Sequence, residues 1–498
     1  MPKRTTSFVL TLSSKNSKTS AYRWLYESLR GEILEGRLRP GTRLPATRDM
    51  AMQYGLARGT IVNAYEQLKS EGYAEGSVGS GTYVSKILPD ELLQVRRVPG
   101  TVPKQSKTKR RFSEYGRRVV PFPSFEIRPT RAFRANQPAL DLFPMDLWTQ
   151  ISARRLRRVS TGLLLGSSPM GYRPLREAVA DYLNASRGVK CVSEQVAIVS
   201  GVQEALDLAA RLFLDPGDRV YMENPGYVGA TIVFKSVGAK ISAVSLDEEG
   251  IALRRQLRGA KLIYVTPGHQ FPLGITMSLA RRLELLEWAH RAGALIFEDD
   301  YDSEYRYVGR PVPALQGLDR HGLVLYAGTF SKVLFPSLRL GYMVIPQDLV
   351  DSFSAIKSVT SRHAPVLEQA VLCDFITEGH FGRHIRRMRE VYAERLSVLL
   401  ECGRERLKGM MEISSIEAGL QTVGWLQNGL KAEEVAKAGL EQEIEMIPIS
   451  SYTQGSFSSE GLQLGFAAVD TAEIRRGVRE LGGLLEKLLT AKKGRKGG

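Results

Sequence analysis

Cysteine is scarce in this sequence of 498 residues. Its three cysteines, Cys191, Cys373 and Cys402, lie far apart, and no two of them form a C-x-x-C pair. This spacing implies neither a disulfide framework nor a cysteine-based zinc finger. We therefore expect a protein of a reducing compartment.

Long apolar runs are also lacking. The first residues, MPKRTTSFVLTL, place a short apolar run after basic residues, but the polar SSKNSK follows soon after, unlike in a secretory signal. No stretch approaches the roughly eighteen apolar residues that a membrane-spanning helix needs. The sequence predicts a cytoplasmic protein without a membrane partner.

Acidic residues are outnumbered by basic ones. The chain has 69 lysines and arginines against 53 aspartates and glutamates, which gives a net charge of +16. Clustered basic side chains bind polyanions because they displace counterions from phosphate backbones. Charge alone, however, fits a merely basic soluble protein equally well.

Length and composition indicate more than one folded domain. A chain of 498 residues exceeds the size of one ordinary core. Its 43% of hydrophobic and 24% of charged residues are the balance of a globular protein. At least two domains are therefore expected, one of them large.

Helical periodicity starts near residue 21. The pattern AYRWLYESLRGEILEG at 21–36 puts four apolar side chains on one stripe before GRLRPG ends the helix. A shorter helix is predicted at 47–54, with Thr47 as its cap and Gly55 at its end. The stripe of the first helix consists of Tyr22, Leu25, Leu29 and Ile33.

The third predicted helix, ARGTIVNAYEQLKSEG at 57–72, has two different faces. Two helices joined by a short turn are typical of a helix-turn-helix. The following YAEGSVGSGTYVS alternates and is broken by glycines, as in a two-stranded wing. The helical stripes alone favour a plain three-helix bundle with a hairpin. The apolar face consists of Ile61, Ala64, Tyr65 and Leu68, and the opposite face carries Arg58, Thr60 and Asn63.

Three strings in this region carry a more specific signal. PGTRLPATRDMA, GLARGTIVNAYEQLKSEGY and GSGTYV occur in this order, and they resemble the GntR family of regulators. The resemblance implies a winged helix-turn-helix over 15–86 that binds double-stranded DNA through guanidinium groups and a close glycine backbone. Ala57 and Gly59 stand where relatives often carry polar side chains. The residues expected at the DNA surface are Arg43, Arg48, Arg58, Thr60, Asn63 and Gly81.

Residues 87–122 favour a basic linker. The segment has no sustained period, several prolines and an excess of basic residues. Its arginines either add nonspecific phosphate contacts or belong to a tether that is only solvated. A second basic run, RRLRR at 154–158, fits the exposed face of a helix. The linker arginines are Arg110, Arg111, Arg117 and Arg118.

Strand-like runs alternate with amphipathic helices over 123–490. This is the layout of an α/β domain with a mostly parallel sheet. In such sheets ligands gather at the carboxyl ends of the strands. The predicted strands are 197–199, 219–222, 261–265, 294–297, 323–327 and 339–345.

Two segments near predicted strand ends carry chemistry. FEDDYDSEYRY places Asp299 and Asp300 where carboxylates also serve as helix caps or metal ligands. YAGTFSKVLFPSLRLGY places Lys332 after another strand, where a lysine is also an ordinary surface residue. Together they meet the need of an aldehyde cofactor for a Schiff-base lysine and a carboxylate that keeps its pyridine nitrogen protonated. Arg339 adds a bidentate phosphate ligand.

Four longer strings are similar to the MocR subfamily of GntR regulators: SGVQEALDLAARLFLDPGDRVYMENPGY, TPGHQFPLGITMSLARRLELLEWA, EDDYDSEYRY and GTFSKVLFPSLRLGYMVIP. The resemblance spans nearly the whole chain. It implies a fold-type-I aminotransferase-like domain that binds pyridoxal 5'-phosphate (PLP) as an internal aldimine at Lys332. It also implies that Asp299 pairs with the pyridine nitrogen, Tyr301 reaches the ring oxygen and Tyr227 stacks on the ring. The residues expected around the phosphate are Val202 and Gln203, at a helix N-terminus, Thr329, Ser331 and Arg339.

Three positions depart from the family pattern. Phe271 replaces an asparagine that bonds the ring oxygen in aminotransferases, and Gln421 stands where MocR relatives often have histidine. Gln463 stands where many relatives have an arginine, and it cannot form a charge-paired fork with a substrate carboxylate. With the fused DNA-binding domain, Gln463 leads us to expect an effector that is PLP itself or an amine bound without the usual carboxylate recognition. Transamination is then slow or absent.

The sequence as a whole predicts a PLP-dependent transcription regulator of metabolic genes. We expect a homodimer with exchanged domains that reads two half-sites. Two alternatives stay open: an active aminotransferase with an accessory DNA-binding domain, and a repressor whose second domain has lost its cofactor. The pair His380 and His384 also allows a metal site, but a helix surface is the favoured interpretation and no metal is expected.

Overall fold

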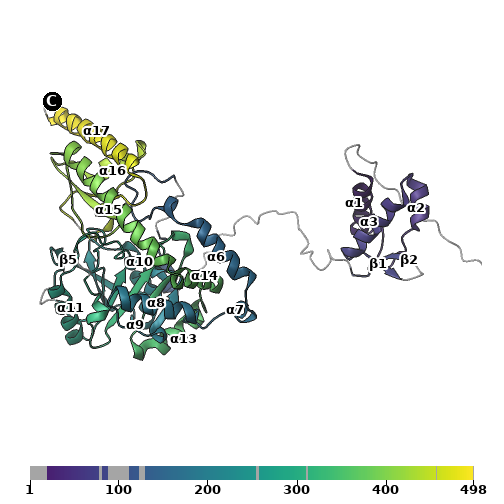
Figure 1. Ribbon diagram of the computed structural model, residues 1–498, viewed down its shortest axis with the longest axis horizontal. Coiled ribbons are helices and arrows are strands. Elements are labelled where there is room, and N and C mark those ends of the chain that lie inside the picture. The colour runs from purple at the N-terminus through teal and green to yellow at the C-terminus, as the bar shows by residue number, and fades with distance from the viewer. Residues whose placement is uncertain are drawn as a thin grey trace, which may run out of the picture. The chain divides into compact units, whose positions relative to one another are not determined.

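The chain was examined as a computed structural model. Its contacts divide the chain into two compact units, Met1–Arg110 and Arg111–Gly498 (Figure 1). Most of the predicted linker and the predicted start of the second domain, 88–110 and 123–128, lie outside the described residues. The structure describes residues 20–77, 81–87, 111–122, 129–253, 257–309, 312–455 and 457–496.

The first unit consists of three helices and a two-stranded wing. The elements are α1 (Ala21–Leu34), α2 (Thr47–Tyr54), α3 (Arg58–Ser70), β1 (Ala74–Ser77) and β2 (Gly81–Val84). The two strands are antiparallel, and the predicted apolar faces of α1 and α3 form the core. These buried residues are Leu25, Leu29, Ile33, Ile61, Ala64, Tyr65 and Leu68, whereas Tyr22 is half-buried. The winged helix-turn-helix is confirmed.

Helix α2 begins differently from the prediction and ends as predicted. Thr47 is its first helical residue, and the N-cap is Ala46, whose side chain makes no capping bond. The prediction that Thr47 caps the helix is therefore wrong. At the other end, Gly55 has a left-handed conformation (φ 62°), and its N–H bonds to the carbonyl of Ala51. Glycine adopts this conformation without a Cβ clash, so it ends the helix.

The second unit is built on an eight-stranded sheet with the strand order β3-β10-β9-β8-β7-β4-β5-β6. All six predicted strands are present, and β5 and β6 were not predicted. The sheet is parallel from β9 through β8, β7 and β4 to β5. Strand β10 is antiparallel to both β3 and β9. The strands are β3 (Val196–Val199), β4 (Arg219–Asn224), β5 (Lys240–Asp247), β6 (Gly250–Ile251), β7 (Ala260–Val265), β8 (Leu295–Asp300), β9 (Val324–Thr329) and β10 (Gly341–Val344).

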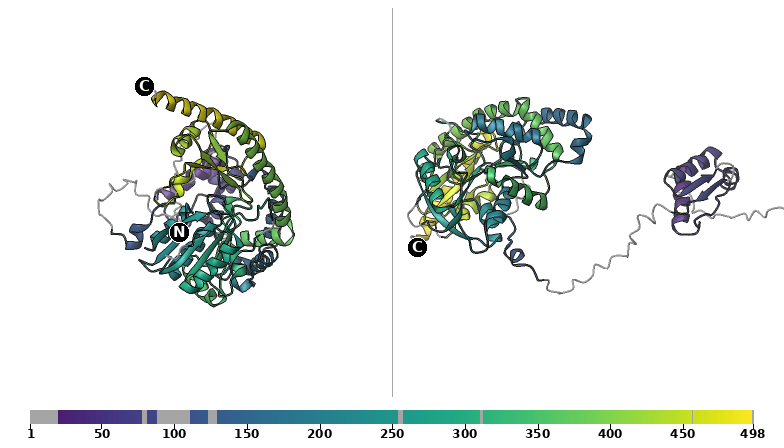
Figure 2. Two further views of the ribbon diagram at one scale, coloured as in Figure 1. Left: turned by 90° about the vertical axis from the view of Figure 1, so that its left-hand side faces the viewer. Right: turned by 90° about the horizontal axis from the view of Figure 1, so that it is seen from below.

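Both faces of this sheet are buried, as a parallel sheet requires. Neighbouring residues of one strand belong to different core clusters, since Ile263 and Ile296 pack on one side and Leu262 and Phe297 on the other. Helices pack around the sheet (Figure 2). They are α6 (Met145–Arg157), α7 (Thr161–Leu165), α8 (Arg173–Ser186), α9 (Val202–Phe213), α10 (Val228–Ser236), α11 (Leu279–Ala292), α12 (Leu315–Leu318), α13 (Val350–Thr360) and α14 (Val366–Thr377).

A smaller antiparallel sheet follows, with the strand order β11-β12-β14-β13. It lies with the last two helices at one end of the unit (Figure 1). None of the described helices combines the length and apolar character needed to cross a bilayer. The elements are α15 (His380–Arg406), β11 (Met411–Ile413), β12 (Gln421–Leu426), α16 (Ala432–Glu441), β13 (Ile447–Pro448), β14 (Gly461–Gly465) and α17 (Thr471–Lys496).

The last part of the predicted linker packs on the second unit. Residues 111–122 contain a short helix, α5 (Glu114–Arg118). Arg118 Nε donates to the carbonyl oxygen of Ser236 at 3.1 Å, and Arg211 Nη2 donates to the hydroxyl of Tyr115 at 2.8 Å. The tether is therefore shorter than the sequence pattern indicated.

Candidate functional site

Asp299, near the end of β8, has one oxygen without a partner. Its side chain is only 4% exposed, and Oδ2 accepts a 2.6 Å hydrogen bond from the hydroxyl of Tyr264. Oδ1 is buried and has no hydrogen-bond partner within the described part of the chain. Burial raises the pKa of Asp299 to about 7. A buried acceptor of this kind is costly unless a donor reaches it, and a protonated ring nitrogen supplies such a donor.

Its neighbour Asp300 belongs to a buried ion pair. Oδ2 of Asp300 accepts from Arg187 Nη2 and from the hydroxyl of Tyr326, both at 2.5 Å. Burial alone would raise the pKa of Asp300, but Arg187 lowers it below its ordinary value. Oδ1 of Asp300 is also buried without a partner among the described residues, so the feature that distinguishes Asp300 from Asp299 is its ion pair with Arg187.

Lys332 follows β9 and points into the same region of the unit. Its Nζ donates to the carbonyl oxygen of Asn136 at 2.7 Å. Burial lowers the pKa of Lys332 to about 8 because the charged form loses its hydration. A lysine with a lowered pKa has more of the neutral amine that attacks an aldehyde. It is not an ordinary surface lysine.

Hydrogen-bond donors gather at the start of α9, where the sequence predicts a phosphate site. Gly201 is the N-cap (φ 129°), and Val202 and Gln203 are the first helical residues, so their N–H groups are free of helical bonds and face an anion favourably. A Cβ on Gly201 would lie 3.4 Å from a guanidinium nitrogen of Arg339. The hydroxyl of Ser331 is buried without a partner among the described residues. Backbone N–H groups, a guanidinium and a hydroxyl, all of which can donate to an anion, thus lie in this part of the unit.

The position of Thr329 differs from that of the other predicted phosphate ligands. Its Oγ1 accepts the backbone N–H of Ser331 at 3.1 Å. This bond orients the turn between β9 and Lys332. The hydroxyl hydrogen of Thr329 remains available to a ligand, so Thr329 and Ser331 both stay predicted phosphate ligands.

An ion pair near the start of α9 was missed by the sequence analysis. Oε2 of Glu204 accepts both the backbone N–H and the hydroxyl of Ser200 at 2.6 Å. Its Oε1 accepts from Lys357 Nζ at 3.0 Å, and Lys357 is only 1% exposed. Burial would raise the pKa of Glu204, but Lys357 and Ser200 lower it. The pair holds the loop that leads into α9.

Aromatic side chains form a wall of the site. Tyr227 accepts a 2.9 Å hydrogen bond from Gln203 Nε2 and packs edge-to-face on Phe271 with ring centroids 5.8 Å apart. Phe271 packs in the same way on Tyr301 at 5.9 Å. The predicted ring-stacking and ring-oxygen residues, Tyr227 and Tyr301, therefore lie on two sides of Phe271.

His269 and Asp302 support Tyr301 and were not predicted. The hydroxyl of Tyr301 lies 3.0 Å from Nδ1 of His269, and the same nitrogen lies 3.0 Å from Oδ1 of Asp302. Asp302 lies in the acidic run after β8, and His269 lies in the string TPGHQFPLG that resembles the family, but neither was singled out. No periodicity marked His269.

The predicted DNA-binding residues are largely exposed in the first unit. Arg58 is the first residue of α3, and Arg48 lies on α2. Gly81 opens β2 with φ 113°, and a Cβ there would lie 2.8 Å from Arg43 Nε. Arg43 therefore lies against the wing. Exposed residues of the predicted set are Arg43, Arg48, Arg58, Asn63 and Gly81, whereas Thr60 is half-buried.

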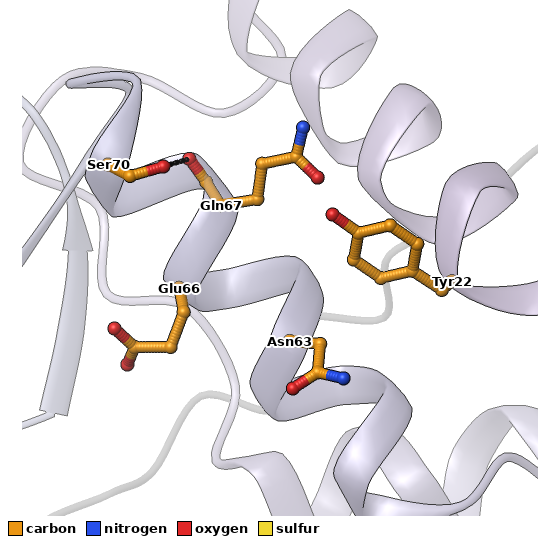
Figure 3. Close-up of a pocket in the computed structure, with 5 residues that line it drawn as sticks. All are labelled: Tyr22, Asn63, Glu66, Gln67 and Ser70. Atoms are coloured by element: carbon orange, nitrogen blue, oxygen red, sulfur yellow. Dashed lines mark hydrogen bonds between the residues drawn. The ribbon is translucent and has the colours of Figure 1, made fainter.

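Asn63 lies in a hollow between α1 and α3. Figure 3 shows it on α3, across from Tyr22 of α1. Gln67 and Glu66 line the same hollow, and Glu66 accepts from Lys69 Nζ at 2.9 Å. Since Glu66 is paired with Lys69, its carboxylate does not exclude a phosphate, and the exposed Asn63 stays a predicted DNA contact.

The two histidines of α15 have separate partners. Nε2 of His384 lies 3.1 Å from the carbonyl oxygen of Val333, and burial lowers the pKa of His384. Nε2 of His380 lies 3.3 Å from Glu378. Across the described ranges, no three histidine, cysteine or acidic side chains lie together as a metal site requires.

Comparison with known proteins assigns each unit to a family. The family described as bacterial regulatory proteins, gntR family, matches residues 21–84, and aminotransferase class I and II matches residues 134–481. A kynurenine aminotransferase of Pyrococcus horikoshii, solved with pyridoxamine phosphate, has 28% identity and a TM-score of 0.67, and the match covers 72% of this chain and 91% of that one. LysN of Thermus thermophilus, solved with N-(5'-phosphopyridoxyl)-L-leucine, has 30% identity and a TM-score of 0.67 over 72% and 92%.

Full-length regulators are similar to the whole chain. It is 29% identical to the pyridoxine biosynthesis transcriptional regulator PdxR of Corynebacterium glutamicum over 92% of this chain and 94% of that protein. It is 41% identical to the probable rhizopine catabolism regulatory protein MocR of Rhizobium meliloti over 94% of each chain. The chain therefore belongs to the MocR subfamily of GntR-type transcription regulators, in which a winged helix-turn-helix precedes a PLP-binding domain of fold-type-I aminotransferase architecture.

Proposed function

We propose that this regulator binds PLP at Lys332 and alters its binding to a double-stranded DNA operator when PLP or an amine effector occupies the site. The observation that carries the proposal is the buried, unpartnered oxygen of Asp299 in the same domain as a lysine of lowered pKa. A GntR-type winged helix on the same chain gives the site a means to act on transcription. We also propose that the protein is cytoplasmic and that its macromolecular partner there is DNA.

The residues present fit the cofactor. Bound PLP supplies an aldehyde carbon that reacts with primary amines and a ring that withdraws electrons. Asp299 would hold a proton at the ring nitrogen, and Tyr301 would bond the ring oxygen. Tyr227 would stack on the ring, a contact of about 1 kcal/mol. The phosphate would be held by Val202, Gln203, Thr329, Ser331 and Arg339.

The DNA contacts of the proposal come from the first unit. Arg48 and Arg58 are exposed cations on the two helices of the helix-turn-helix, which suits contacts to phosphates and guanine edges. Arg43, held against Gly81, suits a contact from the wing. We propose that two copies pair, with exchanged domains, and read two half-sites. Light scattering of the full chain tests the pairing.

The second candidate function is an active aminotransferase. It is favoured by the other expected cofactor residues, although Phe271 departs from the aminotransferase pattern, and by the likeness to solved aminotransferases. We propose instead that transamination is slow or absent, since Gln463 offers no guanidinium for a substrate carboxylate. Turnover of the full chain with a common amino acid and a keto acid tests this. A rate of about one per second or more would establish an enzyme.

The regulatory proposal is tested by Lys332→Ala. The variant is expected to lose the visible absorbance of bound PLP and the effect of PLP or amine on operator binding in a gel-shift assay. Lys235→Ala, which removes an exposed lysine of α10, is the matched control and is expected to keep both. An unchanged spectrum in Lys332→Ala would refute the assignment of Lys332.

A further inference from the structure

Two glutamines that border the cofactor site each have an unused hydrogen-bond donor. Gln421 begins β12, and Gln463 lies in β14, opposite Val423. Residues two apart on a strand share a face, and directly opposed residues share a face, so both side chains project from the same side of the small sheet. Gln421 is 1% and Gln463 is 0% exposed. Neither amide nitrogen has a hydrogen-bond partner within 3.5 Å among the residues described, and the amide of Gln421 faces the hydroxyl of Tyr301.

The amide oxygens of both glutamines are engaged. The backbone N–H of Asn136 donates to Oε1 of Gln421 at 2.8 Å, which fixes the orientation of that amide because an N–H cannot accept. The hydroxyl of Tyr452 donates to Oε1 of Gln463 at 2.8 Å. What each side chain has left is therefore an NH₂ group, a pure donor. A buried donor without an acceptor is unfavourable, so both nitrogens favour a ligand oxygen.

One intervening residue connects each amide to a side chain that borders the expected cofactor site. Asn136 connects Gln421 to Lys332, and Tyr452 connects Gln463 to Phe271. The carbonyl oxygen of Asn136 accepts from Lys332 Nζ at 2.7 Å. On the other side, Tyr452 packs edge-to-face on Phe271 with centroids 5.0 Å apart, and Phe271 packs on Tyr301. Lys332, Tyr301 and Tyr452 are only partly buried. A small molecule that reaches Lys332 thus enters beside the two amides.

The charges around Lys332 disfavour a ligand carboxylate. Asp302 and Asp299 both interact electrostatically with its ammonium group. Arg339 lies at Gly201, where the phosphate is expected. The nearby Arg134 lies 3.5 Å from Glu445. A carboxylate beside neutral amides would be buried close to other carboxylates without a cation of its own, which costs far more than burying a hydroxyl that is hydrogen-bonded.

We propose that Gln421 and Gln463 select a primary amine that carries a hydroxyl group in the place where an amino acid carries its carboxylate. Each amide nitrogen would donate one hydrogen bond to oxygen of the ligand. This inference rests on the proposed function, because the amine is sensed at PLP-loaded Lys332. It names the class of effector that this site senses: a primary amine that carries a hydroxyl group and no carboxylate.

The experiment compares two amines with the same skeleton. Serinol (2-aminopropane-1,3-diol) and L-serine differ by one hydroxymethyl group in place of a carboxylate. The full chain, loaded with PLP, is titrated with each, and the change in cofactor absorbance reports binding. Wild type is expected to respond to serinol at a concentration about tenfold lower than to L-serine, as one or two neutral hydrogen bonds provide.

Variants of Gln463 test the source of the selectivity. Gln463→Arg is expected to reverse the order of the two amines, since a guanidinium pairs with a carboxylate. Gln463→Leu is expected to weaken the response to serinol about tenfold without improving that to L-serine. Gln421→Leu is a second variant with the same expectation, in case one substitution prevents folding. Retained PLP absorbance before titration shows that a variant is folded and loaded.

The two proposals fail in different ways. If wild type shows no PLP absorbance before any amine is added, the proposed function fails. If wild type is loaded but responds to L-serine as well as or better than to serinol, or to neither amine, only the selectivity proposal is overturned. A response to serinol that is unchanged in both leucine variants overturns it as well.

Discussion

The substitution Asp299→Asn tests whether the buried carboxylate of the site lowers the stability of the cofactor-free protein. Burial raises the pKa of Asp299 to about 7 in the folded state. A carboxyl whose pKa is raised on folding contributes stability that is fully present below its unfolded pKa and is lost as the pH rises through the folded value. The cofactor-free protein therefore carries a penalty at pH 8 that a neutral asparagine does not have.

The size of the penalty follows from the shift. With an unfolded pKa near 4 and a folded pKa of about 7, the shift costs the folded state about 4 kcal/mol at pH 8 and about 1.4 kcal/mol at pH 5. In denaturant unfolding of cofactor-free protein, Asp299→Asn is therefore expected to be more stable than wild type, by a margin that falls to about one third between pH 8 and pH 5. The adjacent Asp300→Asn is the control. It breaks the buried pair with Arg187 and is expected to lose about 3–5 kcal/mol.

The same substitution is expected to have the opposite effect on cofactor binding, which it weakens. Asp299 is expected to bind the protonated ring nitrogen, and asparagine is not, so PLP should raise the unfolding midpoint of wild type more than that of Asp299→Asn. The reasoning is refuted if the variant is less stable than wild type without PLP, or if the difference in stability is the same at pH 5 and pH 8.

Four other outcomes are expected. Lys357→Met leaves Glu204 as an uncompensated anion beside the predicted phosphate site, so PLP affinity should fall about tenfold and recover when Glu204→Gln is added; a titration without recovery contradicts this. The rate of PLP binding should increase with pH up to about 8 and then level off, because burial lowers the pKa of Lys332 to about 8 and the neutral amine reacts; a rate that falls over this range contradicts it. Arg58→Ala should weaken operator binding by about 1–3 kcal/mol in gel shifts, and equal affinity would remove Arg58 from the interface. Gly81→Ala meets both a positive φ and the side chain of Arg43, so it should weaken operator binding, and unchanged binding would show that the wing is not involved.

The sequence predicted the strands and helices whose apolar residues follow a regular pattern of burial. Six strands of the large sheet have apolar runs because both their faces are covered. Strand β5, Lys240–Asp247, was missed because most of its residues are exposed or half-buried near the sheet edge, so the pattern resembles a loop. The helix-turn-helix was visible because its apolar stripes have the helical period.

The site was predictable only where a residue follows a strand. Asp299 and Lys332 belong to recognisable segments at strand ends, and the structure shows why each is special. The carbonyl of Asn136, which holds Lys332, and the Lys357 that pairs with Glu204 come from distant parts of the chain. No local pattern marks such residues, because their role depends on tertiary contacts alone.

The central claim is that the amine of Lys332 carries the cofactor. Borohydride reduction of PLP-loaded protein fixes the cofactor to the amine that holds it, and peptide mass spectrometry then locates the modified lysine. We expect the pyridoxyl mass on the peptide that contains Lys332 and on no other. A modified peptide elsewhere, or no modification at all, would contradict the account.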